Sequence, residues 1–102
     1  MRIEHYALPR LKREVKAIVG KYIDLRSHAV FFFGSRVSGR GDARSDIDIG
    51  IEGKEPVPTG AMRKMREALS QLPVLYKIEL VDFRATSSDF RKVAKQHIEK
   101  IS

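Results

Sequence analysis

The chain has 102 residues, of which 42% are hydrophobic and 32% are charged, a balance typical of a single folded domain and not of a disordered segment. Its 20 Lys and Arg residues against 13 Asp and Glu residues give a net charge of +7, which favours polyanionic partners but also fits a well-solvated basic surface. The absence of cysteine excludes disulfides and thiolate zinc sites, and the absence of a signal-type start or of about 18 consecutive apolar residues predicts a cytoplasmic protein without a membrane span.

The first predicted elements are a helix and a buried strand. Apolar residues recur at steps of three and four between Leu8 and Leu25, which predicts an amphipathic helix over residues 8–26. Residues 29–33 are continuously apolar and precede Gly34, as expected of a central strand. Residues 34–45 contain three glycines and predict a short helical turn followed by a loop.

The middle of the chain predicts a second strand and a second long helix. Residues 46–52 alternate polar and apolar side chains, which indicates a strand with one buried face. After a loop with two prolines, Thr59 is a candidate N-cap for a helix that ends at Pro73.

The last third predicts a strand and a final helix. The sequence VLYKIELVDF predicts a strand over residues 74–83. A helix then begins at Ser87 or Ser88 and extends to Ile101, and its apolar residues read as a core stripe. The order αβ(α)βαβα predicts one α/β or α+β domain over residues 1–102, with helices flanking a small mixed sheet.

Two short motifs carry the chemical signal. Gly34 lets the backbone approach a ligand closely, and Ser35 can donate a hydrogen bond to a phosphate oxygen. Ten residues later, Asp46 and Asp48 are two apart on one strand, so both carboxylates point to the same side and can ligate Mg²⁺. Either motif alone is typical of a turn or a solvated strand face, but together they indicate a metal-dependent nucleotide site.

The pattern Phe33-Gly34-Ser35, ten residues, Asp46-Ile47-Asp48 resembles that of the DNA polymerase β superfamily of nucleotidyltransferases. The resemblance runs across nearly the whole chain and is closest to the stand-alone minimal nucleotidyltransferases. It implies the polymerase β-like fold, two Mg²⁺ ions that Mn²⁺ can replace, and an NTP, expected to be ATP, as the donor of a nucleoside monophosphate.

The same resemblance implies a partner. Minimal nucleotidyltransferases typically pair with a small helical protein, either HEPN-type or substrate-binding. In the toxin–antitoxin members the partner is a HEPN ribonuclease, and one of its tyrosines accepts the nucleotide.

The family has a third carboxylate on a later strand, and two residues fit its hydrophobic-acid-hydrophobic pattern. Asp82 shares a strand face with Ile78 and Leu80, whereas Glu79 lies on the more polar face with Lys77. Glu79 is therefore the expected third catalytic and metal-binding residue, with Asp82 as the alternative. Aspartate is commoner at this position in the family, and a glutamate is longer by one methylene group. This difference affects the distance to the metal and the rate of the reaction more than it affects the fold.

Several basic residues lie close to the motifs. Arg36 and Arg44 are in the loop where a triphosphate would arrive, and a guanidinium can bind phosphate through two hydrogen bonds. Arg40 in the same loop is expected to be solvated. The three histidines lack the spacing of metal ligands.

These observations favour an Mg²⁺-dependent enzyme that transfers a nucleoside monophosphate, with AMP expected, to a hydroxyl group on a partner protein. A non-catalytic subunit that neutralises its partner by contact is the alternative, supported by the glutamate at position 79. A nucleic-acid-binding role is allowed by the charge but is disfavoured because the chain lacks a recognised reading surface.

Overall fold

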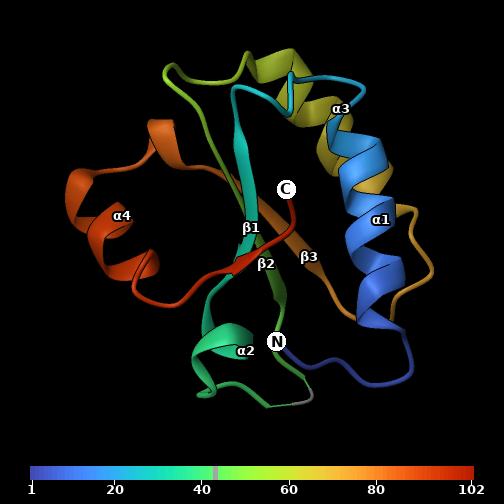
Figure 1. The fold of residues 1–102 in the computed structure, drawn as a ribbon. Helices are drawn as coiled ribbons and strands as arrows, with labels where there is room; N and C mark the ends of the chain where they lie inside the picture. The colour runs from blue at the N-terminus through green and yellow to red at the C-terminus, as the bar shows by residue number, and fades with distance from the viewer. Residues whose placement is uncertain (43) are drawn as a thin grey trace.

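The computed structural model describes residues 1–42 and 44–102. Figure 1 shows the elements in chain order: α1 (Leu8–Val19), β1 (Ala29–Phe33), α2 (Ser35–Ser38), β2 (Ile47–Glu52), α3 (Thr59–Ser70), β3 (Ile78–Asp82), the 3-10 helix η1 (Phe83–Ala85), α4 (Ser88–Ala94) and β4 (Glu99–Lys100). The strands form one sheet in the order β3-β2-β1-β4, in which β2 and β3 are parallel and β1 is antiparallel to β2 and β4. The predicted class, a small mixed sheet flanked by helices, is confirmed. In the described residues, no helix is long and apolar enough to cross a membrane.

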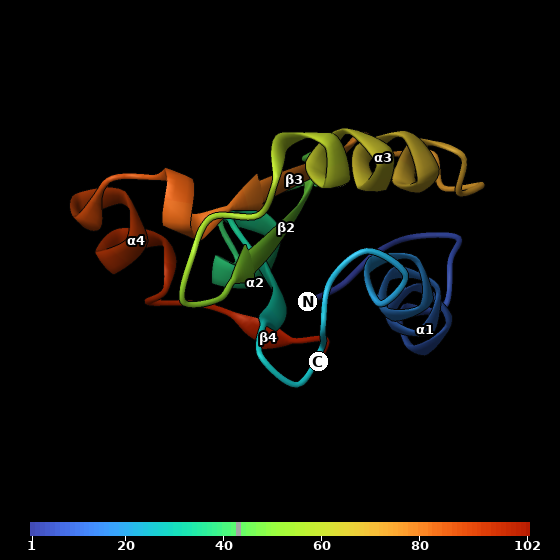
Figure 2. The same cartoon turned by 90° about the horizontal axis from the view of Figure 1, so that it is seen from above.

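One face of the sheet carries the main core. Alternate strand residues, among them Phe32, Ile49 and Leu80, point to this face because side chains alternate along a strand. Helices α1 and α3 cover it with the apolar stripes Leu11, Val15, Val19 and Met62, Met65, Leu69. Figure 2 shows both helices on the same side of the sheet, away from α4.

The opposite face holds a smaller aromatic cluster. Phe31 and Phe33 of β1 pack edge-to-face against Phe83, with ring centroids 4.9 and 5.0 Å apart. Helix α4 lies on this side and adds Phe90, whose ring is 5.5 Å from that of Phe83. The cluster covers only part of the face, so the rest is left for polar side chains.

The first helix and the third strand are shorter than predicted. Helix α1 ends at Val19 and not at residue 26, because Gly20 has a low helix propensity and the chain turns there. Tyr22, predicted to continue the apolar stripe, is 39% exposed. Strand β3 begins at Ile78 and not at residue 74, because Ile78 is opposite Ile47, where β2 begins.

The end of the chain differs most from the prediction. Helix α4 begins as expected, with the Ser87 hydroxyl accepting the Phe90 amide at 3.1 Å, but it ends at Ala94. The chain then returns beside β1 as the fourth strand, and Ile101, the residue after that strand, enters the core. Val93, predicted to be buried, is 67% exposed, since no further helical turn packs it against the sheet.

Glycine at position 50 is required by the aromatic cluster. A Cβ atom at Gly50 would lie 2.5 Å from Phe31 Cε2 and 2.7 Å from Phe83 Cε1. We expect Gly50→Ala to lower the free energy of unfolding by about 1–3 kcal/mol in urea titrations, because rings packed on both sides cannot move apart without cost. Gly60→Ala is the matched control: a Cβ there meets nothing within 4 Å. It should stabilise α3 by roughly 0.5–1 kcal/mol. Equal effects of the two substitutions would contradict this packing.

Candidate active site

Strand pairing brings three carboxylates to one end of the sheet. Asp48 of β2 is directly opposite Glu79 of the parallel strand β3. Both are on the face away from α1 and α3, because their neighbours Ile47, Ile49 and Leu80 fill the core. Asp46 is two residues earlier and exposed. The structure thus brings together the three acids that the sequence singles out.

The electrostatics of this cluster are unfavourable without a cation. Burial, reinforced by repulsion from Asp46 and then from Glu79, raises the pKa of Asp48 from 3.8 to about 6. Lys77 Nζ forms an ion pair with Glu79 Oε1 at 2.8 Å, and this hydrogen bond is the main cause of the raised pKa of Lys77. The pair is exposed to solvent, so it offsets little of the repulsion.

Gly34 brings the backbone against the carboxylates. It follows β1, whose last residue Phe33 is opposite Asp48, and its φ of 81° lies in the left-handed region that favours glycine. A Cβ atom at Gly34 would lie 2.1 Å from Asp48 Oδ2. Any other residue would therefore displace the Asp48 side chain as well as strain the backbone. Ser35, the first residue of α2, is adjacent to this contact.

Arg36 connects the three segments that carry the site. Its Nε donates to the carbonyl of Ser45, the residue before Asp46, at 2.7 Å. Its guanidinium lies over the ring of Tyr76, just before β3, with 4.2 Å from Cζ to the ring centroid. A further hydrogen bond of 3.1 Å reaches the Arg2 carbonyl. Arg36 is thus placed to hold α2, the loop before β2 and the segment before β3 together, and a role in binding phosphate remains a prediction.

Residues 40–42 and 44, between α2 and β2, form local hydrogen bonds. The carbonyl of Ser35 accepts hydrogen bonds from the amides of Arg40 and Gly41, at 3.1 and 2.9 Å. The amide of Arg44 donates to Asp42 Oδ1 at 2.8 Å, and the Arg44 side chain is exposed. Residues 40 and 41 therefore turn back on α2, while phosphate binding by Arg44 remains a prediction.

Asp82, the alternative third carboxylate, is far from this cluster and has a structural role. It is opposite Ile51, at the other end of β2 and β3 from Asp48 and Glu79. It is 6% exposed, and its oxygens accept the amides of Val57 at 2.7 Å and Arg84 at 3.1 Å. Asp82 is therefore not a surface charge at a strand end. Its buried carboxylate anchors the segment before α3.

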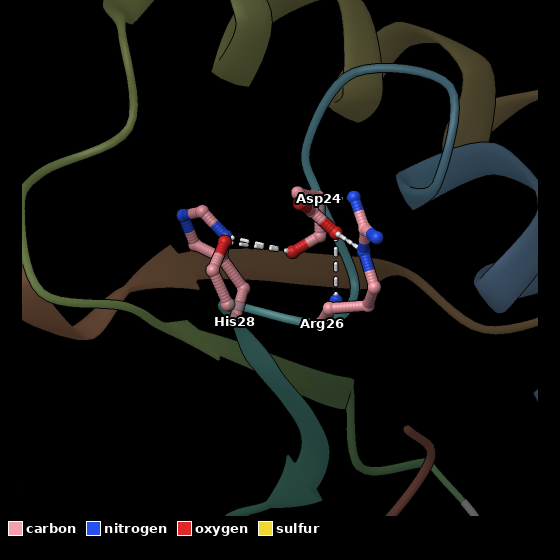
Figure 3. Close-up of polar contacts among 4 residues, drawn as sticks. Asp24, Arg26 and His28 are labelled. Atoms are coloured by element: carbon pink, nitrogen blue, oxygen red, sulfur yellow. Dashed lines mark hydrogen bonds and ion pairs between the residues drawn. The ribbon is translucent and has the colours of Figure 1, made fainter.

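A separate polar cluster lies at the far end of β1. Figure 3 shows Asp24 accepting the Arg26 amide and side chain, at 2.9 and 3.2 Å, while its carbonyl is 2.9 Å from His28 Nδ1. These contacts are local and stabilise the turn between α1 and β1. In residues 1–42 and 44–102, no group of three or more histidine, aspartate or glutamate side chains is arranged to hold a metal ion as it stands.

Sequence reasoning missed a cleft beside Gly34. A cavity of about 290 Å³ is lined by Gly34 and by residues of α2, α4 and the segment after α4, among them Arg40, Phe90 and His97. No pattern in the sequence indicates this cleft, because Phe90 and His97 fit the apolar stripe of a longer helix and the loop position of Arg40 predicts a solvated side chain.

Three comparisons with known proteins show what this chain is similar to. A family model described as "Polymerase beta, Nucleotidyltransferase" matches residues 12–101. A Haemophilus influenzae protein named probable protein adenylyltransferase MntA is 33% identical over 88 residues, which cover 84% of this chain and 77% of that protein. A crystal structure of a toxin–antitoxin with AMP-PNP matches with a TM-score of 0.70 at 21% identity, over 89% of this chain and 72% of that chain. A tri-AMPylated Shewanella oneidensis HEPN toxin in complex with an MNT antitoxin matches with a TM-score of 0.68 at 18% identity, over 93% of this chain and 72% of that chain.

Replacing Asp48 and Asp82 by asparagine should change the stability of the fold in opposite directions in metal-free buffer with EDTA. Because the folded pKa of Asp48 is about 6 against an ordinary 3.8, its charge destabilises the fold fully above pH 6, and this penalty disappears as the pH falls toward 3.8. Because solvent screens this half-exposed group, we take the penalty as about 1 kcal/mol. Asp48→Asn should therefore raise the melting temperature at pH 7.5 by about 4–8 °C. The substitution should have no effect near pH 4, where the penalty is absent.

Asp82→Asn should instead lower stability at pH 7.5 by about 1–3 kcal/mol, because an amide cannot accept both backbone hydrogen bonds. Thermal melts of both variants across pH 4–8 measure the difference. A lower melting temperature for Asp48→Asn at pH 7.5 would mean that its charge accepts a stabilising hydrogen bond, which contradicts the repulsive cluster.

Proposed function

The chain belongs to the polymerase β nucleotidyltransferase family, and from that premise we propose that it transfers AMP from ATP to a hydroxyl group on a HEPN-type partner protein, as the antitoxin of a toxin–antitoxin pair. The family and the fold expected from the sequence are confirmed. The name of the Haemophilus relative supports protein adenylylation. The solved relatives, which are toxin–antitoxin structures with AMP-PNP or with an AMPylated HEPN toxin, support the nucleotide and the partner.

One observation carries the proposal: Asp48 and Glu79 are direct neighbours on paired strands beside Asp46. Repulsion from Asp46 and Glu79 adds to burial in raising the pKa of Asp48, and a divalent cation relieves that repulsion. Their oxygens are the donors that Mg²⁺ prefers. The donor set is open and not a closed cage, which suits an ion that arrives with the triphosphate, since Mg²⁺ commonly combines one or two carboxylates with substrate phosphates.

The residues of the chain then have distinct roles. Asp46, Asp48 and Glu79 would hold the cation pair, and Gly34 and Ser35 would let the triphosphate approach along the backbone of α2. Bound Mg²⁺ would supply charge for the developing pyrophosphate and lower the pKa of the attacking hydroxyl. The acceptor oxygen bonds to the α-phosphorus, the bond to the bridging oxygen breaks, pyrophosphate leaves, and the hydroxyl proton passes to solvent. Glu79 has to exchange its contact with Lys77 for the metal.

We expect α-labelled ATP with Mg²⁺ to label a co-expressed HEPN-type partner. Asp48→Asn and Glu79→Gln should reduce the labelling rate by about 10²-fold or more, because each removes charge that balances the transition state. Glu67→Gln, which neutralises an exposed acid on α3, is the matched control and should label at the wild-type rate.

A stable complex that acquires no label with any NTP, with either Mg²⁺ or Mn²⁺, would overturn the proposal. It would favour the second candidate, a subunit that neutralises its partner by contact alone. The ion pair between Lys77 and Glu79 is the observation that favours this candidate, because it leaves Glu79 engaged in the absence of a cation.

A further inference from the structure

The cleft beside Gly34 is a ligand-sized space that the catalytic carboxylates do not use. Its volume of about 290 Å³ is close to the lower end of small-molecule sites. One wall comes from the end of β1 and from α2, and the other from α4 and the segment that follows it. It therefore joins two parts of the chain that are far apart in the sequence.

The cleft and the carboxylate cluster share Gly34. One side of this glycine contacts Asp48, as the 2.1 Å approach of a Cβ atom to Asp48 Oδ2 shows, and the same residue lines the cleft. Phe33, another lining residue, is directly opposite Asp48 in the sheet. A ligand bound at the carboxylates can therefore extend into the cleft without crossing a strand.

The walls of the cleft suit a flat ring. Phe90 packs edge-to-face against Phe33, with centroids 6.2 Å apart and planes at 87°, yet it is still 40% exposed. Part of this ring is thus available to a ligand, and aromatic side chains stack on any nucleobase because every base has a π-face. The stretch from Phe90 to His97 was predicted as buried core, but here it faces a cavity.

The polar groups of the cleft suit the edge of a base and a nearby phosphate. Gln96 offers an amide donor and an amide acceptor, and His97 adds an imidazole. Arg40 is the one lysine or arginine among the described residues that line the cleft, and none of those residues is an acid. The three carboxylates nearby form the proposed metal-binding region, whereas the described residues that line the cleft include no negatively charged side chain.

We propose that this cleft binds the nucleobase of the transferred nucleotide, a purine stacked on Phe90 with its edge hydrogen-bonded by Gln96 and His97. The inference rests on the proposed function and extends it to the specificity of the same site. Arg40, at the end of the cleft nearest α2, then contacts the phosphate or ribose side of the nucleotide. The triphosphate lies toward Gly34 and Ser35, and the base lies toward α4.

The experiment compares Mg–ATP with Mg–tripolyphosphate, which has the charge but no base. The probe is a fluorescent etheno-ATP that each ligand displaces; the chain has no tryptophan to interfere. Phe90→Leu keeps an apolar contact with the aromatic cluster but removes the ring, and Gln96→Ala changes an exposed residue. Each should weaken ATP binding by about 10-fold, the loss expected from removing one stacking or hydrogen-bonding contact, and leave tripolyphosphate binding unchanged. Lys92→Ala, on α4 but outside the cleft, should change neither.

The results that overturn the inference differ from those that overturn the proposed function. Unchanged ATP affinity in both cleft variants, or an equal loss for ATP and tripolyphosphate, excludes a base in the cleft. An unchanged ATP affinity combined with a higher KM for the protein acceptor would assign the cleft to the acceptor side chain instead. A wild-type protein that binds neither ATP nor tripolyphosphate with Mg²⁺ would overturn the proposed function itself. If the wild type binds both ligands and the Asp46→Asn variant binds neither, the proposed function is supported.

Discussion

Repulsion among Asp46, Asp48 and Glu79 is the constraint on which the rest of the structure depends. Hydrophobic burial creates it: once Ile49 and Leu80 face the core, alternation along the strands forces Asp48 and Glu79 onto the other face, and the parallel register places them opposite each other. The packing that stabilises the sheet therefore also concentrates negative charge at one end of it. This energetic cost is what a cation and a triphosphate would recover on binding.

One face of the sheet carries the main hydrophobic core, and the other carries the candidate active site. Helices α1 and α3 cover one face, while the other has a small aromatic cluster, the short helix α4 and the carboxylates. Gly34 is where these parts meet, because its backbone contacts Asp48 and lines the cleft under α4. Arg36 fixes the surrounding segments from the other side of α2. One face of the sheet thus carries both the carboxylates and the cleft of the proposed nucleotide site.

The sequence predicts features that depend on local patterns, such as which face of a strand a residue occupies. It does not predict features that depend on contacts between distant segments. Alternation along the strands was enough to prefer Glu79 to Asp82, because parity decides which face a residue occupies. The burial of Asp82 was missed, since its two amide partners come from a loop and a 3-10 helix that no periodicity reveals. The final strand was missed for the same reason: the stretch up to Ile101 has helical spacing, but pairing with β1 prevails over it. The engagement of Arg36 with Ser45 and Tyr76 depends on a fold that brings three segments together.

Anomalous diffraction at the manganese absorption edge tests most directly whether the proposed metal site joins β2 to β3. In crystals grown with AMP-PNP and Mn²⁺, we expect an anomalous peak bonded to the carboxylates of both Asp48 and Glu79 and to a phosphate oxygen of the nucleotide. A nucleotide bound with its manganese away from these two residues would contradict the claim. So would a manganese ion held by Asp82.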